Sequence, residues 1–182
     1  MLEFLRTHMD LLTVLWLFPI VFMFHDFEEI LTVEKWTRAN RQKVAALFPK
    51  WFPKWLESSF HMTTLQFSRD VFWIFLFITL AALLAVQFSF YPFFILFLTV
   101  FFLHVFTHAG MALYLRSYTP GVITAVLLVL PYSLLAYDRL FHEQILNWSN
   151  LFLSMAIVIL LFPFFALMLI KERNRLAGKA KR

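Results

Sequence analysis

Long runs of apolar residues, separated by short polar stretches, cover most of the chain. A helix needs about 20 apolar residues to cross the hydrocarbon core of a bilayer, and five stretches approach that length with few charges. The pattern therefore predicts an all-α integral membrane helix bundle with about five transmembrane helices. The expected spans are 11–33, 71–90, 92–115, 121–137 and 151–170, within a single membrane domain of residues 1–182.

The connections between these spans are of very unequal length. Phe90, Tyr91 and Pro92 leave almost no room between the second and third spans, which predicts a tight antiparallel hairpin. The one long connection, 35–69, combines Lys and Arg with Trp and Phe, a composition typical of an amphipathic segment in the headgroup plane. By the positive-inside rule it is cytoplasmic, as is the basic tail 171–182. We therefore expect a multi-pass protein of the cell membrane with its N-terminus outside.

The composition agrees with lipid as the solvent and limits the chemistry. The chain is 62% hydrophobic and 20% aromatic, with only 15% charged residues. Its net charge of +5 is concentrated beside apolar spans, so membrane lipids, and not nucleic acid, are the expected partners. The first apolar run lacks a small-residue cleavage site, which predicts a retained helix. Because the chain has no cysteine, a metal would have to be held by nitrogen and oxygen.

Ionisable residues interrupt the first span. His25, Glu28 and Glu29 share one helical face, while Asp26 points about a quarter turn away. Each ionisable group inside a membrane costs a few kcal/mol on insertion scales. Such a concentration indicates a functional site.

The third span carries a second polar set, His104 and His108, spaced by four residues so that both imidazoles can reach one ion. The predicted topology places both sets at a similar depth in the cytoplasmic half of the membrane. We therefore expect a divalent metal, zinc first and iron second, bound by His25, Glu29, His104 and His108. A single membrane histidine is more often an interhelical hydrogen-bonding residue, which is the simpler alternative for each imidazole.

Two further residues, Glu57 and His61, stand four apart in the long connection and are possible additional ligands, as is Asp26. A solvated surface pair is the competing explanation for Glu57 and His61.

The pattern His25-x-x-Glu28-Glu29 in a first membrane helix, followed by a later histidine motif, resembles the HXXEE-domain proteins, a family of small multi-span membrane proteins. The resemblance covers roughly the first three quarters of the chain and implies a functional site at these residues. In that family the later motif begins with Asn, whereas here His104 precedes His108 by four, so His108 is the closer match.

The leading functional hypothesis is a metal-dependent membrane enzyme acting on a lipid or another apolar small molecule. Hydrolysis is preferred because the first motif is similar to the H-x-x-E-H arrangement with its last His replaced by Glu, which makes Glu28 the candidate catalytic base. A di-iron oxidase or hydroxylase is the first alternative.

A cation or proton transporter is the second alternative, although the apolar outer halves of the spans offer no polar route. A metal-free assembly protein is the third, with the carboxylates paired to arginines such as Arg38, Arg69 or Arg116.

Overall fold

The computed structural model describes residues 9–46 and 62–179, and its regular elements are all helices. The long helices are α2 (Leu11–Ala45), α4 (Thr64–Phe88), α5 (Pro92–Leu115), α7 (Leu130–His142) and α8 (Trp148–Lys179). A short α6 (Val122–Thr124) and a π-helical turn, η2 (Ala125–Val129), lead directly into α7.

Within the described residues, four helical stretches are long and apolar enough to cross a membrane, and α8 adds a fifth helix with a shorter apolar stretch, Trp148–Leu161. The predicted all-helical membrane bundle is confirmed. The four stretches are Leu11–Val44, Thr64–Phe88, Pro92–Leu115 and Val122–His142.

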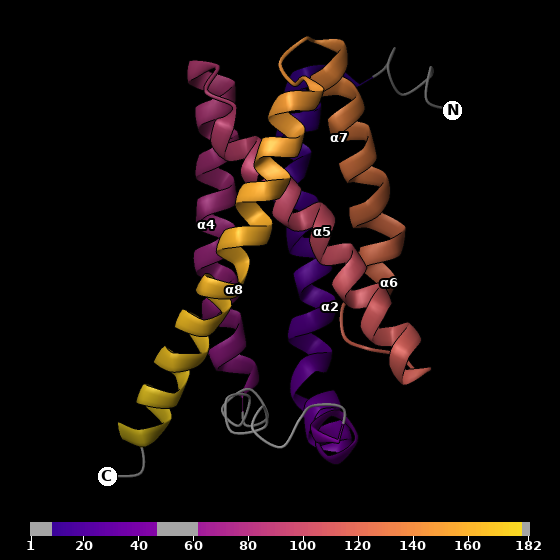
Figure 1. The fold of residues 1–182 in the computed structure, drawn as a ribbon, viewed down its shortest axis with the longest axis vertical. Coiled ribbons are helices and arrows are strands. Elements are labelled where there is room, and N and C mark those ends of the chain that lie inside the picture. Colours follow the sequence, from indigo (N-terminus) through magenta and orange to yellow (C-terminus); the bar gives the residue numbers. More distant parts are fainter. Residues whose placement is uncertain (1–8, 47–61, 180–182) are drawn as a thin grey trace.

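Successive long helices run in opposite directions (Figure 1). In that view α2, α5 and α8 descend while α4 and α7 ascend, so the start of α2 and the end of α8 lie at opposite ends of the bundle. The first and third spans are therefore parallel, as the sequence predicts. α2 packs along both α4 and α7, and α5 packs against α8.

The helix ends are set by local capping. The Asp10 side chain accepts a hydrogen bond from the Thr13 backbone, which caps α2 and lowers the pKa of this carboxyl. At the start of α4, Thr63 and Gln66 form a reciprocal capping box, so this helix begins before the expected residue 71. Ser89 has a left-handed backbone (φ 53°) and Pro92 opens α5, which confirms the tight hairpin.

The first helix continues past 33, the expected end of its span, to Ala45. The polar extension lies against the end of α5, because Trp36 Nε1 donates to the Tyr118 carbonyl (2.8 Å) and Lys43 Nζ to the Leu115 carbonyl (3.1 Å). Lysine near a helix C-terminus satisfies carbonyls that have no partner within the helix. Of the connection expected at 35–69, residues 35–45 thus belong to α2 and 64–69 to α4, while 47–61 lie outside the described residues.

The fourth span is helical over Val122–His142, which is longer than the expected 121–137. Within it, the Leu130 N–H bonds to the Ala125 carbonyl, a π-helical step of five residues. Pro131 follows directly and explains the irregularity, because its ring has no N–H and crowds the carbonyl four residues earlier. The chain thereby gains one residue between α6 and α7 relative to an α-helix.

The core of the bundle is aromatic. Phe18 of α2 is fully buried, and its ring contacts Phe94 (5.2 Å between ring centroids) and Phe101 (5.5 Å) of α5 and Tyr132 (5.8 Å) of α7. On α4 the buried positions include three small residues, Ala81, Ala82 and Ala85.

A buried polar trio joins three helices near the crossing of α5 and α8. Tyr137 OH donates to Thr99 Oγ1 (3.1 Å), which lies 3.0 Å from Ser154 Oγ. Thr99 and Ser154 also donate to carbonyls of their own helices. These bonds satisfy all three hydroxyl groups within the apolar core.

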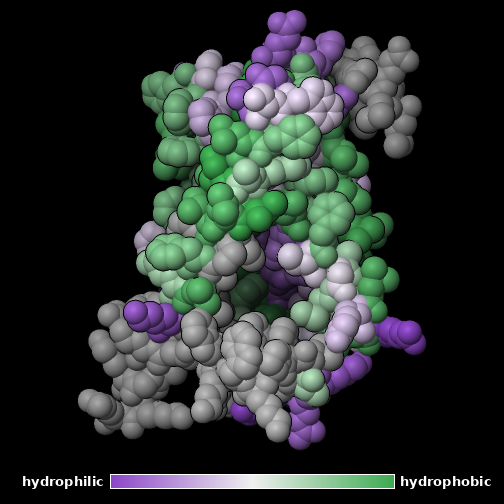
Figure 2. All heavy atoms as spheres, viewed as in Figure 1, coloured by the Kyte–Doolittle hydropathy of each residue, from purple (hydrophilic) through white to green (hydrophobic). Residues whose placement is uncertain are grey.

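The surface has the polarity of a membrane protein. Figure 2 shows a broad band of hydrophobic side chains, with hydrophilic residues gathered at the two ends. The same face has a hollow with hydrophilic residues at its base, in the lower half where α5 and α8 diverge in Figure 1.

Candidate metal centre

α2 supplies two of the predicted ligands. His25 and Glu29 are four residues apart, so one turn of helix places them on the same face. The His25 side chain is almost completely buried (1% exposed), and the Glu29 side chain is 14% exposed.

α5 supplies the other two. His104 and His108 are again one turn apart, and their Nε2 atoms lie 2.7 Å from each other, a hydrogen-bonding distance. The Thr107 hydroxyl donates to the His104 carbonyl (2.7 Å), and its oxygen lies 3.2 Å from His104 Nδ1.

The two pairs converge where α2 and α5 face each other. The His25 ring centroid lies 5.5 Å from that of His104 and 5.0 Å from that of His108. Each of the four residues offers one ligand atom, and all four atoms lie within 4.8 Å of one another. The structure therefore brings together the four residues expected to bind a metal, in a group that could hold one ion.

The spacing within the cluster is uneven. Two ligands of one tetrahedral zinc ion lie about 3.3 Å apart, given zinc–nitrogen bonds of about 2.0–2.1 Å. Glu29 Oε1 and His108 Nε2 already have this separation, 3.3 Å. The two Nε2 atoms of His104 and His108, 2.7 Å apart, would have to separate by about 0.6 Å to bind the same ion.

Glu28, the candidate base, is not a member of the group, and its carboxylate bonds to the segment after α5. One carboxylate oxygen, Oε2, accepts from the Thr124 backbone N–H (2.8 Å) and the Thr124 hydroxyl (2.6 Å). The other, Oε1, accepts from Tyr118 OH (2.8 Å), whose pKa is raised by burial. Both oxygens of Glu28 thus fasten α2 to the region that precedes α7.

Gly121 is pressed against the cluster. A Cβ atom at this position would lie 2.7 Å from His108 Cε1, 2.9 Å from Glu29 Cγ and 3.0 Å from His25 Cε1. Gly121 also has a positive φ of 80°, which side chains other than glycine rarely adopt. Only glycine allows the chain to turn this close to three of the four ligands.

The remaining candidates are not part of the group. Asp26 is buried (5% exposed), and its Oδ2 atom lacks a hydrogen-bond partner among the described residues. Glu57 and His61 lie outside the described residues.

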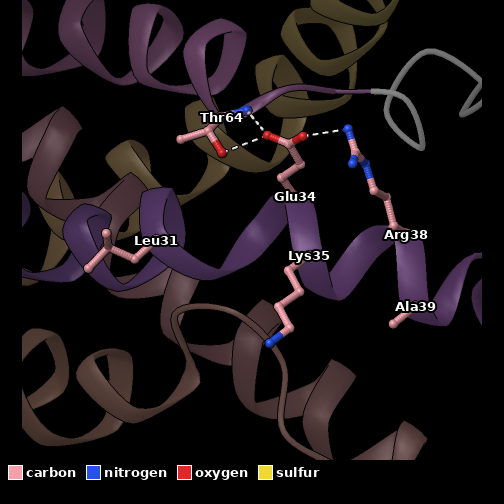
Figure 3. A pocket seen from close by; sticks show the side chains of 6 residues that line it. All are labelled: Leu31, Glu34, Lys35, Arg38, Ala39 and Thr64. Carbon is pink, nitrogen blue, oxygen red and sulfur yellow. Dashed lines mark hydrogen bonds and ion pairs between the residues drawn. The ribbon is translucent and has the colours of Figure 1, made fainter.

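An open pocket at the polar end of α2 is separate from this centre (Figure 3). There the Glu34 carboxylate accepts from both the N–H and the hydroxyl of Thr64 and pairs with Arg38. The pocket contains no member of the His/Glu group, and its polar contacts fix the start of α4 against α2. Its lining residues are Leu31, Glu34, Lys35, Arg38, Ala39 and Thr64.

Reasoning from the sequence misses three residues that surround the cluster: Tyr118, Gly121 and Thr124. Tyr118 follows the end of the third expected span, where a tyrosine is commonly just an interfacial residue. Gly121 offered a signal, because the chain has only three glycines and this one follows Thr119 and Pro120 in a typical turn sequence. Thr124 offered none, since its role depends on how the fourth span packs against α2.

Comparison with characterised proteins and with solved structures gives no match. Residues 16–136, about two thirds of the chain, match a family described as proteins of unknown function with an HXXEE motif. This stretch contains both halves of the His/Glu cluster and all of the residues that surround it, and it confirms the resemblance expected from His25, Glu28 and Glu29. The chain belongs to the HXXEE family.

Proposed function

We propose that this protein is a metal-dependent membrane enzyme whose His/Glu cluster binds one divalent metal ion and acts on an apolar substrate. The observation that carries the proposal is the convergence of four ligand atoms, from two helices far apart in sequence, within 4.8 Å inside an apolar bundle. Ionisable groups in a membrane interior are costly and commonly mark functional sites.

The hydrogen bonds of the cluster support metal binding over a purely structural role. Buried polar atoms in native proteins are nearly always paired, yet His25 Nε2 is buried without a partner in the described structure. A buried imidazole nitrogen beside a carboxylate and two further imidazoles is suited to ligate a metal.

One ion fits the donors better than two. Di-iron centres in helix bundles use several carboxylates, typically a Glu from each of four helices, whereas Glu29 is the only carboxylate in the described group. Nitrogen donors with a single carboxylate suit zinc first and iron second.

An enzyme also needs an open coordination position, since catalytic zinc sites keep three protein ligands. We assign His25, Glu29 and His108 as the permanent ligands, because the distance between Glu29 and His108 already suits one ion. His104, too close to His108 for joint binding without movement, would lie beside the open position. A bound divalent ion would supply Lewis-acid activation of a water or a carbonyl oxygen, which favours hydrolysis.

The surroundings favour an enzyme over a transporter. Phe101 packs against His25 (5.7 Å between ring centroids), and Phe22 packs against Phe101 (5.8 Å), so aromatic side chains cover the cluster on the side toward the start of α2. On one face the hollow in Figure 2 interrupts the hydrophobic band, which supports access for an apolar substrate from the membrane. A transporter would need a polar route through the aromatic core.

Elemental analysis of the purified protein tests the metal centre. We expect about one zinc ion per chain in the wild type, a background amount in His25→Ala and His108→Ala, and retained zinc in His104→Ala. Wild-type protein with only background metal would refute the proposal.

Two other outcomes would correct part of the proposed function. Loss of metal from His104→Ala equal to that from His108→Ala would show a closed four-ligand site, which is typical of a structural metal. About two iron ions per chain would favour the di-iron oxidase.

We further propose that the N-terminus is outside the cell and the C-terminus in the cytoplasm, on the positive-inside rule. The chain has no cysteine, so single cysteines can be introduced at the exposed Ser117, after α5, and Ser149, at the start of α8. A membrane-impermeant maleimide added to intact cells is expected to label Ser149→Cys, and to label Ser117→Cys only after permeabilisation. The reverse pattern would invert the topology.

A further inference from the structure

We infer that Thr124 is a positioning residue of the proposed metal centre: its hydroxyl holds His25 in the tautomer that leaves Nε2 free for the ion, and Glu28 fixes the direction of that hydroxyl. The inference rests on the proposed metal-binding function and adds to it a residue from outside the HXXEE motif.

The hydrogen bonds of Thr124 determine where its single hydroxyl proton lies. Oγ1 is 2.6 Å from Glu28 Oε2 and 3.3 Å from the Gly121 carbonyl. A carboxylate oxygen at the shorter distance is the stronger acceptor, so the hydroxyl donates to Glu28. The Thr124 hydroxyl can then only accept from other groups.

His25 Nδ1 lies 2.9 Å from the same Thr124 Oγ1. Because the hydroxyl proton is already committed to Glu28, this contact requires His25 Nδ1 to carry the proton and donate it. In a neutral imidazole the other nitrogen, Nε2, then has a free lone pair, and this is the nitrogen that is buried without a partner. The chain from Glu28 through Thr124 to His25 thus selects the nitrogen that can ligate.

This arrangement is an outer shell of the kind that metal-binding histidines need. Such histidines almost always donate their second N–H to a carboxylate, a carbonyl or a water, which fixes the tautomer and the ring orientation. Here a hydroxyl group, itself bonded to a carboxylate, takes that place.

Thr124 is held by more than its side chain. Its backbone N–H also donates to Glu28 Oε2 (2.8 Å), so the residue is fixed to α2 at two points. In this arrangement Glu28 acts on His25 through Thr124, and its role as catalytic base stays a prediction from the sequence pattern.

Zinc titration of the purified full-length protein in micelles tests the inference. Thr124→Val keeps the shape of the side chain but removes the hydroxyl, and is expected to weaken zinc binding about 10- to 100-fold. Thr124→Ser keeps the hydroxyl and is expected to bind zinc as wild type does. Tyr137→Phe removes a buried hydroxyl that donates to Thr99 Oγ1, outside the cluster, and serves as the control with wild-type affinity.

A spectroscopic measurement on the metal-free protein keeps the test independent of zinc affinity. Nitrogen-15 NMR of the His25 ring, assigned with a His25→Gln variant, is expected to show the Nδ1–H tautomer in wild type and in Thr124→Ser. In Thr124→Val the tautomer preference is expected to be lost, while circular dichroism of the metal-free protein shows the wild-type helix content.

The outcomes separate this inference from the proposed function. If wild type binds zinc and Thr124→Val binds it equally well, the role of Thr124 is refuted and the metal centre stands. An Nε2–H tautomer of His25 in the metal-free wild type would also refute the role of Thr124. If wild type binds no metal, the metal centre and the inference both fail.

Discussion

Replacement of Gly121 by Ala is expected to abolish tight metal binding. The added Cβ would lie 2.7 Å from His108 Cε1 and within 3.0 Å of atoms of Glu29 and His25, closer than real Cβ contacts. The positive φ of 80° adds a backbone penalty of about 1–2 kcal/mol for any residue with a Cβ. Since three ligands would have to shift together, the loss should exceed the 10- to 100-fold typical of outer-shell substitutions.

Gly110 provides the matched control, because a Cβ at that position on α5 would meet no atom within 4 Å. Gly110→Ala should leave metal binding intact and stabilise the helix by about 0.5–1 kcal/mol, the usual difference between Ala and Gly in a helix interior. The measurement is zinc affinity by titration, with circular dichroism to confirm that both variants remain helical. Equal zinc affinities for the two variants would contradict the packing of Gly121 against the cluster.

Replacement of Phe18 by Ala is expected to give the largest loss of stability of any single substitution considered. The ring is fully buried and contacts aromatic residues from α5 and α7, so its removal leaves a cavity where three helices meet. Phe→Ala changes in protein cores typically lower the free energy of unfolding by about 3–5 kcal/mol. The cavity part of this loss persists in a membrane protein, because the lining atoms lose their contacts whatever the solvent.

Phe24, on the same helix and 60% exposed, is the appropriate control. Unfolding in mixed micelles should show little change for Phe24→Ala, because its ring lies on the surface of the bundle. A Phe18→Ala variant no less stable than Phe24→Ala would contradict the aromatic core.

Much of the fold is predictable from the sequence because membrane helices must be long and apolar. The hairpin at Phe90 and Pro92 followed from local chemistry alone, and the structure places its ends as expected. The residues at which the helices end were harder to predict. Ala45 ends α2 far beyond its apolar span because Trp36 and Lys43 bond to the end of α5, a tertiary effect that hydropathy does not contain.

The candidate site, too, has features that the sequence predicts and features that it does not. The pairs on α2 and α5 followed from helical spacing, and their convergence followed from two parallel spans with polar residues at similar depth. The hydrogen-bond partners of Glu28 could not be predicted, because one helical face, about 100° wide, borders both the cluster and the segment after α5. The packing of α6 against α2 decides that Glu28 bonds to Thr124.

The π-helical turn at Ala125–Val129 acts as a phase shift between two parts of the fourth span. Successive residues of an α-helix are related by a rotation of about 100° about the helix axis. The π-helical turn adds one residue to this repeat. Thr124, before the turn, therefore faces His25 while Ala136 and Leu140, after it, face the core. In a regular α-helix that kept Ala136 and Leu140 in the core, Thr124 would face away from His25. The π-helical turn therefore allows the fourth span to contact His25 and the core at the same time.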